Sequence, residues 1–238
     1  AWLRYRYWQP RHCKVATRLI AISRYVADQL MAFGVDSSSI EVIPNGITIK
    51  RPRVVSPESE DLLVLARHDV NKNLPAVLRG VAQLQRINPE WKGVLRIIGR
   101  QGRQSSIVRR LRKELTNPKQ VKLIDAMPDQ ELLTCIRSSL ALISASSEEG
   151  FDYPVLEAKA EGIPTILSDI RVHREFHQSS SLFFSDDDGT GLANNVHALL
   201  VENRIWGDLS RNGFSLAKQL SVEAQQTAIR NQLADLLK

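Results

Sequence analysis

The sequence has only two cysteines, Cys13 and Cys135, and neither has a second Cys or a His at metal-ligand spacing. Neither a disulfide framework nor a zinc site is therefore indicated. No apolar run reaches the ~18 residues that cross a bilayer, and no apolar segment near the start precedes a small-residue cleavage site. We therefore expect a cytoplasmic protein. Because regular structure begins almost at Ala1, we also expect a piece of a longer chain.

Two nucleotide-binding fingerprints are also missing. The sequence has no P-loop and no Gly-x-Gly-x-x-Gly, and the "GRQG" at 99–102 is too short for one, which argues against a dehydrogenase. The 32 Lys and Arg outnumber the 26 Asp and Glu, so the excess charge favours an anionic ligand or surface. The basic residues are spread along the chain and no groove-binding motif is present, so we do not expect nucleic acid as a partner.

Short runs rich in β-branched residues alternate with segments of helical period after residue 60. The segment 73–87 is typical of the helices: its apolar residues share one face, Asn73 is a candidate N-cap, and Pro75 lies in the first turn. This alternation predicts an α/β fold with a parallel sheet covered by helices on both faces. The expected strands are 62–67, 94–99, 121–125, 140–145, 165–169 and 181–185.

The two ends of the chain differ from this middle part. The start predicts one strand-helix-strand unit, with elements at 17–23, 24–34 and 40–46, followed by a polar, proline-containing linker at 47–60. The other end predicts three consecutive helices without a strand between them, and Ser221 is a candidate cap for the last one.

The loop after the first strand of the main sheet, "ARHDVNKN", places Arg67 and Lys72 just before a helix N-terminus. In an open α/β sheet, ligands collect at the carboxyl ends of the strands, where helix N-termini favour negative charge. Two cations at such a place suit a diphosphate, which must be held and stabilised as it leaves. Two solvated surface cations are an equally good interpretation of the spacing alone.

A second loop, in "SSEEGFDYPVLEAKAEGIP", carries two carboxylates eight positions apart, Glu149 and Glu157. Gly150 allows the backbone to approach a ligand, and Pro154 suits the first turn of a helix. We expect Glu157 in that first turn, where its carboxylate can accept two ribose hydroxyl hydrogen bonds. For a single Glu near a helix start, ordinary complementation of the helix dipole is the simpler interpretation.

Four segments in order along the chain resemble the family-4 glycosyltransferases: "TRLIAISRYVADQLMAFGV", "IEVIPNGI", "LLVLARHDVNKNLPAVLRGVAQL" and "EGFDYPVLEAKAEGIPTILSD". The last is similar to that family's donor-site signature, Glu-Gly-Phe-Gly-x-Pro-x-x-Glu-Ala followed by Gly-x-Pro. The resemblance implies the GT-B architecture, in which two Rossmann-like domains face each other across a cleft. It also implies a retaining sugar transfer from a nucleoside-diphosphate sugar, with neither a bound metal nor a cofactor.

The resemblance implies a role for each matching residue. Arg67 and Lys72 would hold the donor diphosphate and stabilise it as it leaves, and Glu157 would bind the ribose. The side facing the transferred sugar would come from four consecutive residues: Glu149, Gly150, Phe151 and Asp152. Two departures from the family pattern stand out. Asp152 replaces the usual Gly, which would put an extra carboxylate beside the sugar subsite, and Ala66 replaces the usual Gly before Arg67.

The resemblance also divides the chain. Residues 1–46 would be the closing unit of the N-terminal acceptor domain, 47–60 a linker, 61–220 the donor domain, and 221–238 a helix that crosses back to the first domain. We expect four apolar positions of that helix to contact 1–46: Val222, Ile229, Leu233, and either Leu236 or Leu237. Since the acceptor pocket is absent, we expect the chain alone to be inactive in transfer.

"SDIRVHREF" at 168–176 resembles members that build bacterial surface polysaccharides, often from GDP-mannose. A UDP-sugar is the other donor we expect, and the acceptor would be a glycan or a lipid-linked glycan. His173 and Arg174 could approach a phosphate, but a surface pair at a helix start is the favoured interpretation.

Three alternatives stay open. Asp186 and Asp188 in "FFSDDDG" resemble the metal site of the other glycosyltransferase architecture, which would make transfer metal-dependent. The chain could instead be a module that binds a nucleotide sugar without transferring it. The third concerns "WLRYRYWQPRHCK" at 2–14, whose aromatic and basic residues suit a peripheral contact with the inner membrane surface or a helix face covered by the missing domain.

Overall fold

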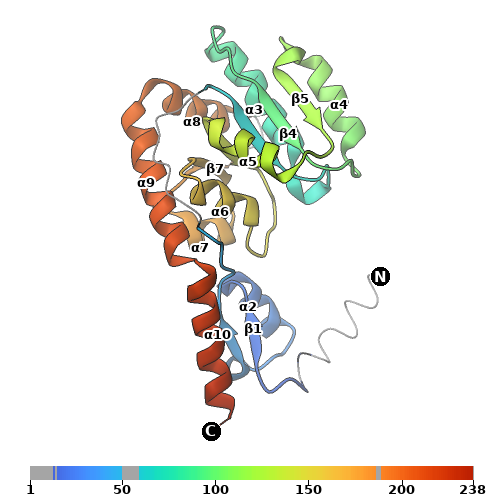
Figure 1. Cartoon of the computed structure of the whole chain (residues 1–238). Helices are drawn as coiled ribbons and strands as arrows, with labels where there is room; N and C mark the ends of the chain where they lie inside the picture. Colours follow the sequence, from blue (N-terminus) through green and yellow to red (C-terminus); the bar gives the residue numbers. More distant parts are fainter. Residues whose placement is uncertain (1–12, 14, 50–58, 186–188, 238) are drawn as a thin grey trace.

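The structure is a computed structural model in which residues 13, 15–49, 59–185 and 189–237 are described. Its main body is a six-stranded parallel sheet, and a smaller strand-helix-strand unit lies beside the long C-terminal helices (Figure 1). The α/β class expected from the sequence is confirmed. Of the expected membrane contact at 2–14, only Cys13 is among the described residues. The Asp186/Asp188 pair lies outside them.

The six strands are those expected from the sequence, each shorter by one or two residues. They are β3 (Leu62–Leu65), β4 (Leu95–Ile98), β5 (Val121–Ile124), β6 (Ala141–Ser144), β7 (Thr165–Ser168) and β8 (Leu182–Phe184). They pair in the order β5-β4-β3-β6-β7-β8, all parallel. The chain therefore enters this sheet at the central strand β3 and adds β4 and β5 on one side. It then returns to the centre and adds β6, β7 and β8 on the other side, as in a Rossmann-like fold.

Helices cover the sheet on both faces (Figure 1). They are α3 (Leu74–Ile87), α4 (Ser105–Glu114), α5 (Asp129–Ser138), α6 (Tyr153–Ala160), α7 (Arg171–His177), α8 (Thr190–Val201) and α9 (Asn203–Gln219). Helix α3 packs against α4 and α8, and α6 packs against α9. Asn73 is the N-cap residue of α3, as expected, but its backbone is left-handed, with φ of 46°, and its side chain makes no capping hydrogen bond.

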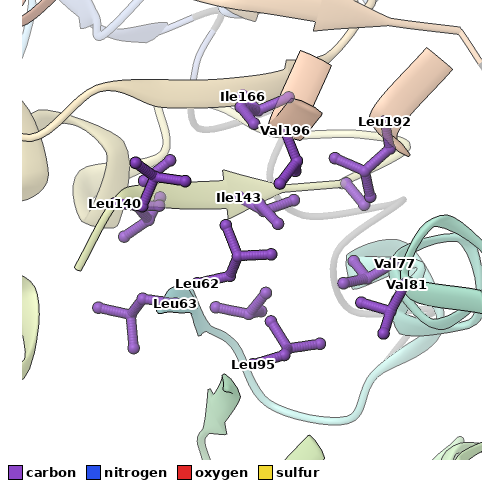
Figure 2. Close-up of a cluster of buried hydrophobic side chains, with 14 of the residues drawn as sticks. Leu62, Leu63, Val77, Val81, Leu95, Leu140, Ile143, Ile166, Leu192 and Val196 are labelled. Atoms are coloured by element: carbon purple, nitrogen blue, oxygen red, sulfur yellow. The ribbon is translucent and has the colours of Figure 1, made fainter. Parts of the chain in front are cut away.

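The main core is formed by the strands of the sheet and the helices that pack on them (Figure 2). Figure 2 shows Leu62, Leu95 and Ile143 of the sheet near Val77 of α3 and Val196 of α8. All five are at most 1% exposed, so the strands are buried like those of other parallel sheets. A second core cluster joins α6 and α9 to the first unit and the linker through Ile22, Ile47 and Ile49.

The small unit consists of β1 (Leu19–Ala21), α2 (Arg24–Ala32) and β2 (Ile40–Val42), with β1 parallel to β2. It contacts the main body through α7. The Glu175 carboxylate accepts hydrogen bonds from the backbone N–H groups of Arg24, at 2.7 Å, and Tyr25, at 3.2 Å. An acidic side chain of one body thus caps the N-terminus of a helix in the other.

Helix α10 (Val222–Leu236) begins beside the start of the linker. The Ile47 N–H donates to the Leu220 carbonyl oxygen at 2.9 Å, and the Ile47 carbonyl oxygen accepts from the Val222 N–H at 3.1 Å. A Cβ at Gly46 would lie 2.5 Å from the Ser221 carbonyl oxygen. The expectation that Leu233, Leu236 and Leu237 pack on residues 1–46 is wrong, because they are 55%, 43% and 89% exposed. Val222 and Ile229, nearer the start of α10, are half-buried.

Candidate functional site

The candidate site lies where the strand order reverses, between β3 and β6. The loop after β3 and the loop after β6 leave the same edge of the sheet and touch, since the Ser147 backbone N–H donates to the Asn71 carbonyl oxygen at 2.8 Å. In open α/β sheets this point is where ligands bind. The two loops carry the residues that the sequence singled out.

Lys72 and Glu149 are brought together by this contact. The Lys72 Nζ donates to Glu149 Oε1, and the Ser146 hydroxyl donates to the same oxygen at 2.7 Å. The two side chains are 24% and 13% exposed, so the pair lies in a partly closed position. Nothing in the spacing of the sequence indicated Ser146 as a partner of Glu149.

Arg67 is separate from this pair. Its side chain is 64% exposed, and within the described part of the chain its one ion pair is with Asp69, at 3.4 Å. The structure therefore places Lys72 against Glu149 and leaves the Arg67 guanidinium at the surface of the same loop. Ala66, beside it, lines a narrow crevice together with Lys72 and Asp152.

Helix α6 starts just before Pro154, which lies in its first turn as expected. Asp152 is the N-cap residue, with a left-handed φ of 69°, and the helix begins at Tyr153. The expectation of Glu157 in the first turn is therefore wrong, since it is the fifth helical residue. Burial raises the pKa of the Glu157 carboxyl, and the charges of Asp152 and Asp129 raise it further.

Glu157 lines an open groove of about 620 Å³ between α6, α5 and the linker. Asp129 and Leu132 of α5 form one wall, and Ile47 of the linker lies at another side. The groove mixes apolar side chains with a few carboxylates and amides, which is the usual composition of a small-molecule site. Its size and its carboxylate suit a nucleoside.

Asp152 is a buried residue of the crevice that Lys72 and Ala66 line. Its side chain is 3% exposed, and its Oδ2 accepts hydrogen bonds from Ser144 Oγ, at 2.5 Å, and His173 Nε2, at 3.0 Å. Burial raises the pKa of this carboxyl, but the His173 and Ser144 hydrogen bonds and the Lys72 charge outweigh burial, so the net shift is downward. The carboxylate of Asp152 is therefore held by His173 and Ser144, and its place beside a sugar subsite stays a prediction.

Gly150 and Phe151 connect the site to the first unit. A Cβ at Gly150 would meet Ile22 at 3.4 Å and Val26 at 3.7 Å, so this turn of the loop lies against α2. The Phe151 ring is buried and packs edge-on against Phe176, with centroids 5.1 Å apart. Phe151 can therefore offer a ligand only its backbone.

His173 and Arg174, near the start of α7, lie in different environments. Arg174 is a surface residue, whose guanidinium donates to both Asp169 oxygens at 2.6 and 2.8 Å. His173 is fully buried, so its expected place on the surface is wrong. A signal was present: Val172, His173, Phe176 and His177 have the i, i+1, i+4, i+5 spacing of one helix face, and all four point inward.

Within the described ranges, no three His, Cys, Asp or Glu side chains are arranged to hold a metal ion. The cation at the candidate site is instead the ammonium of Lys72, with the guanidinium of Arg67 nearby in sequence. Cationic side chains can stabilise a leaving diphosphate as a bound metal does.

Two family descriptions match the chain. Residues 47–227 match the glycosyl transferases group 1, and residues 1–51 match glycosyltransferase family 4. The curated relatives include the serotype-specific mannosyltransferase WbdA of Escherichia coli, 33% identical over 106 residues, which are 44% of this chain and 13% of that protein. The lipopolysaccharide 1,6-galactosyltransferase of Salmonella typhimurium is 31% identical over 157 residues, covering 63% of this chain and 42% of that protein.

The fold is also found among solved structures. The pneumococcal O-GlcNAc transferase GtfA, solved with UDP and GlcNAc, has a TM-score of 0.81 at 16% identity, and the match covers 98% of this chain and 48% of that chain. At this identity the likeness shows the fold alone. The chain spans less than half the length of the curated relatives it matches.

Proposed function

The chain belongs to the group 1 glycosyltransferases, and from this premise we propose that it forms the donor-binding half of a retaining, metal-independent sugar transferase. The donor is a nucleoside-diphosphate sugar, and the acceptor is a glycan or a lipid-linked glycan of bacterial surface polysaccharide synthesis. The observation that carries the proposal is the meeting of Lys72 and Glu149 at the point where the strand order reverses.

The diphosphate takes the place that Glu149 now occupies beside Lys72. A phosphate oxygen is a stronger partner for the ammonium than a carboxylate already bound by Ser146, so Lys72 exchanges one anion for the other. Arg67 is exposed and pairs with Asp69 on the same loop, so its guanidinium is able to reach the same phosphates. Glu157 holds the ribose hydroxyls from its groove.

Glu149 then faces the sugar. Its carboxylate is fixed by Ser146, and Lys72 moves to the leaving diphosphate, so a negative charge remains beside the carbon that becomes positive as the bond breaks. Preorganised charges of this kind stabilise a transition state without having to reorient. No cofactor is needed in this proposal, because Lys72 supplies the positive charge and Glu149 the negative charge.

GDP-mannose and the UDP-sugars are the donors we propose. The mannosyltransferase among the relatives supports GDP-mannose. The galactosyltransferase among them and the UDP in a structural neighbour support a UDP-sugar. Binding without transfer is the alternative for this chain alone, since transfer needs donor and acceptor to be held together.

We also propose a cytoplasmic protein with a peripheral contact at the inner membrane surface, made by α4 and the strand after it. None of the described helices has the length and apolar character to cross a membrane. The expectation of evenly spread basic residues is wrong: residues 100–122 carry eight Lys or Arg and one Glu, while the rest carry 24 Lys or Arg and 25 Asp or Glu. Such a surface attracts anionic phospholipids.

Sedimentation with phosphatidylglycerol vesicles tests this contact. Reversing Arg109 and Lys113 to Glu should abolish co-sedimentation, whereas reversing Arg86 and Lys92, exposed cations elsewhere, should change it little. Binding that survives the first pair, or binding to RNA but not to vesicles, contradicts the membrane contact.

Calorimetry with UDP, GDP and their sugars tests the donor site directly. Wild type should bind at least one of them at a single site. Arg67→Ala or Lys72→Ala should weaken that binding by about 1 to 3 kcal/mol, and the exposed Lys92→Ala should leave it unchanged. Added EDTA should have no effect, and affinity that depends on a divalent ion would favour the Asp186/Asp188 alternative. Unchanged affinity in both site variants, with circular dichroism intact, would remove the assignment.

A further inference from the structure

We propose that His173 is a positioning residue of the donor site, which, paired with the buried Asp152, fixes the loop that carries Glu149. The inference rests on the proposed function, but the pairing itself can be tested without a ligand. It concerns a residue that contacts neither the groove nor the crevice of the candidate site.

The His173 ring lies between two hydrogen-bond acceptors. Its Nδ1 is 2.9 Å from the Ser168 carbonyl oxygen, and its Nε2 is 3.0 Å from Asp152 Oδ2. The ring is fully buried and the Asp152 side chain is 3% exposed, so water does not share these bonds. A carbonyl oxygen only accepts, and therefore Nδ1 carries a proton.

The second nitrogen faces an oxygen that already accepts a hydrogen bond from Ser144, at 2.5 Å. The hydrogen bonds and the Lys72 charge hold the pKa of Asp152 below its ordinary value despite burial, so Asp152 is a carboxylate. A carboxylate oxygen only accepts, and therefore Nε2 carries a proton as well. His173 is therefore an imidazolium and Asp152 a carboxylate. The pair is a buried, charge-assisted contact, which fixes geometry more firmly than a bond between neutral groups.

The same network reaches Glu149 by a second route. The Ser168 hydroxyl donates to the Ser146 carbonyl oxygen at 2.5 Å, and the Ser146 hydroxyl donates to Glu149 Oε1 at 2.7 Å. His173 contacts Ser168 at one nitrogen and Asp152 at the other. Both ends of the loop from Ser146 to Asp152 are thereby tied to one ring.

The pair also explains why an Asp can stand at this N-cap. The left-handed backbone of Asp152 suits Gly best and is tolerated by Asp and Asn. A carboxylate there would be buried without a partner if His173 were absent, at a high cost. The neighbouring titratable groups are Lys72 and Glu157, which interact with Asp152, and His177, which interacts with both His173 and Lys159.

The helix that carries His173 is itself held in place. On the outward face of α7, Arg171 pairs with Asp28, and Glu175 accepts the two N-terminal N–H groups of α2. The ring therefore acts from a helix that is anchored to the first unit. We infer that the position of the Glu149 loop depends on α7 as well as on its own sequence.

The test compares two ligands in calorimetry. His173→Gln keeps one donor toward Asp152 but removes the charge and the bond to Ser168. It should lower the affinity for the nucleotide sugar at least tenfold, while the affinity for the nucleoside diphosphate stays within threefold, because Lys72 and Arg67 hold the phosphates. Asp152→Asn, which keeps the shape and tolerates the backbone, should show the same selectivity. Equal loss of both ligands, or loss of neither, overturns the proposal.

A spectroscopic signature separates this idea from the proposed function. Nitrogen-15 NMR of the free chain at neutral pH should show His173 protonated on both nitrogens, and on only one in Asp152→Asn. A neutral ring in the wild type overturns the proposal even if donors bind. A doubly protonated ring in a chain that binds no nucleotide rejects the proposed function and leaves the ion pair standing.

Discussion

Two histidines of α7, one turn apart, show how differently the same buried side chain can be used. His173 and His177 are at most 1% exposed and their ring centroids are 6.4 Å apart. His173 has acceptors at both nitrogens, whereas neither nitrogen of His177 has a hydrogen-bond partner among the described residues. Burial alone therefore does not identify a functional histidine; its partners do.

The contrast extends to the two ends of α6. Its N-cap, Asp152, is paired with His173 below the candidate site. Near its other end, Lys159 is fully buried and donates to the Ser180 carbonyl oxygen at 2.5 Å and to the Ser180 and Ser181 hydroxyls at 2.9 Å. Burial lowers the pKa of Lys159 well below its ordinary value. The N-cap of α6 thus has a charged partner, whereas the buried ammonium near its other end bonds to neutral oxygens.

The largest effect we expect comes from the same substitution at both histidines. His173→Leu should destabilise the fold by about 3 to 5 kcal/mol, because it leaves the Asp152 charge buried without its partner. His177→Leu should cost less than about 1 kcal/mol, because it removes a polar ring whose nitrogens bond to nothing described and replaces it with an apolar side chain of similar volume. Urea unfolding of both variants measures the difference. Equal costs would erase the distinction between the two residues.

Lys159 gives the next largest effect. Lys159→Ala should lose about 2 to 5 kcal/mol, since it leaves a cavity and frees three acceptors. Lys159→Met fills the cavity and removes a buried cation, so it should recover at least half of that loss. Thermal or urea unfolding compares the two. If Met is as costly as Ala, the ammonium hydrogen bonds and not the packed volume hold this end of α6.

Much of the fold could be predicted from the sequence, because its signals are local. Runs of β-branched residues gave the six strands, and their alternation with helices gave the parallel sheet. The direction of the Asp152 side chain could not be predicted, since it follows from a positive φ that no pattern of residue types reveals. Ser146 and Ser168 were missed for a similar reason: their partners come from loops that meet only in the folded chain.

The pH dependence of stability sharpens the contrast further. Burial lowers the pKa of His177 well below its ordinary value, as the charge of Lys159 also does. The unfolded chain therefore binds a proton near pH 6.5 that the folded chain does not, and stability falls as the pH drops below about 6.5. The slope should approach 1.4 kcal/mol per pH unit. His177→Leu should flatten it, leaving a smaller slope from His68, whose pKa burial also lowers. An unchanged slope in the variant contradicts the assignment to His177.

The smallest effects should come from the exposed end of α10. Leu236→Ala should change the free energy of unfolding by less than about 0.5 kcal/mol, because the side chain is 43% exposed. Gly46→Ala should cost more, since the new Cβ would meet the Ser221 carbonyl oxygen. Hydrogen exchange in residues 17–46 then reports which contact holds the first unit. Larger loosening from Leu236→Ala than from Gly46→Ala would restore the original expectation for this helix.

The most direct test of the account is the affinity of UDP and GDP for two variants that break one ion pair from opposite sides. If Lys72 exchanges Glu149 for the diphosphate, Lys72→Ala should lose at least tenfold in affinity. Glu149→Gln, which frees the same ammonium, should bind as tightly as the wild type or more tightly. If instead both variants weaken binding equally, or neither changes it, Lys72 and Glu149 form a structural pair and the diphosphate binds elsewhere.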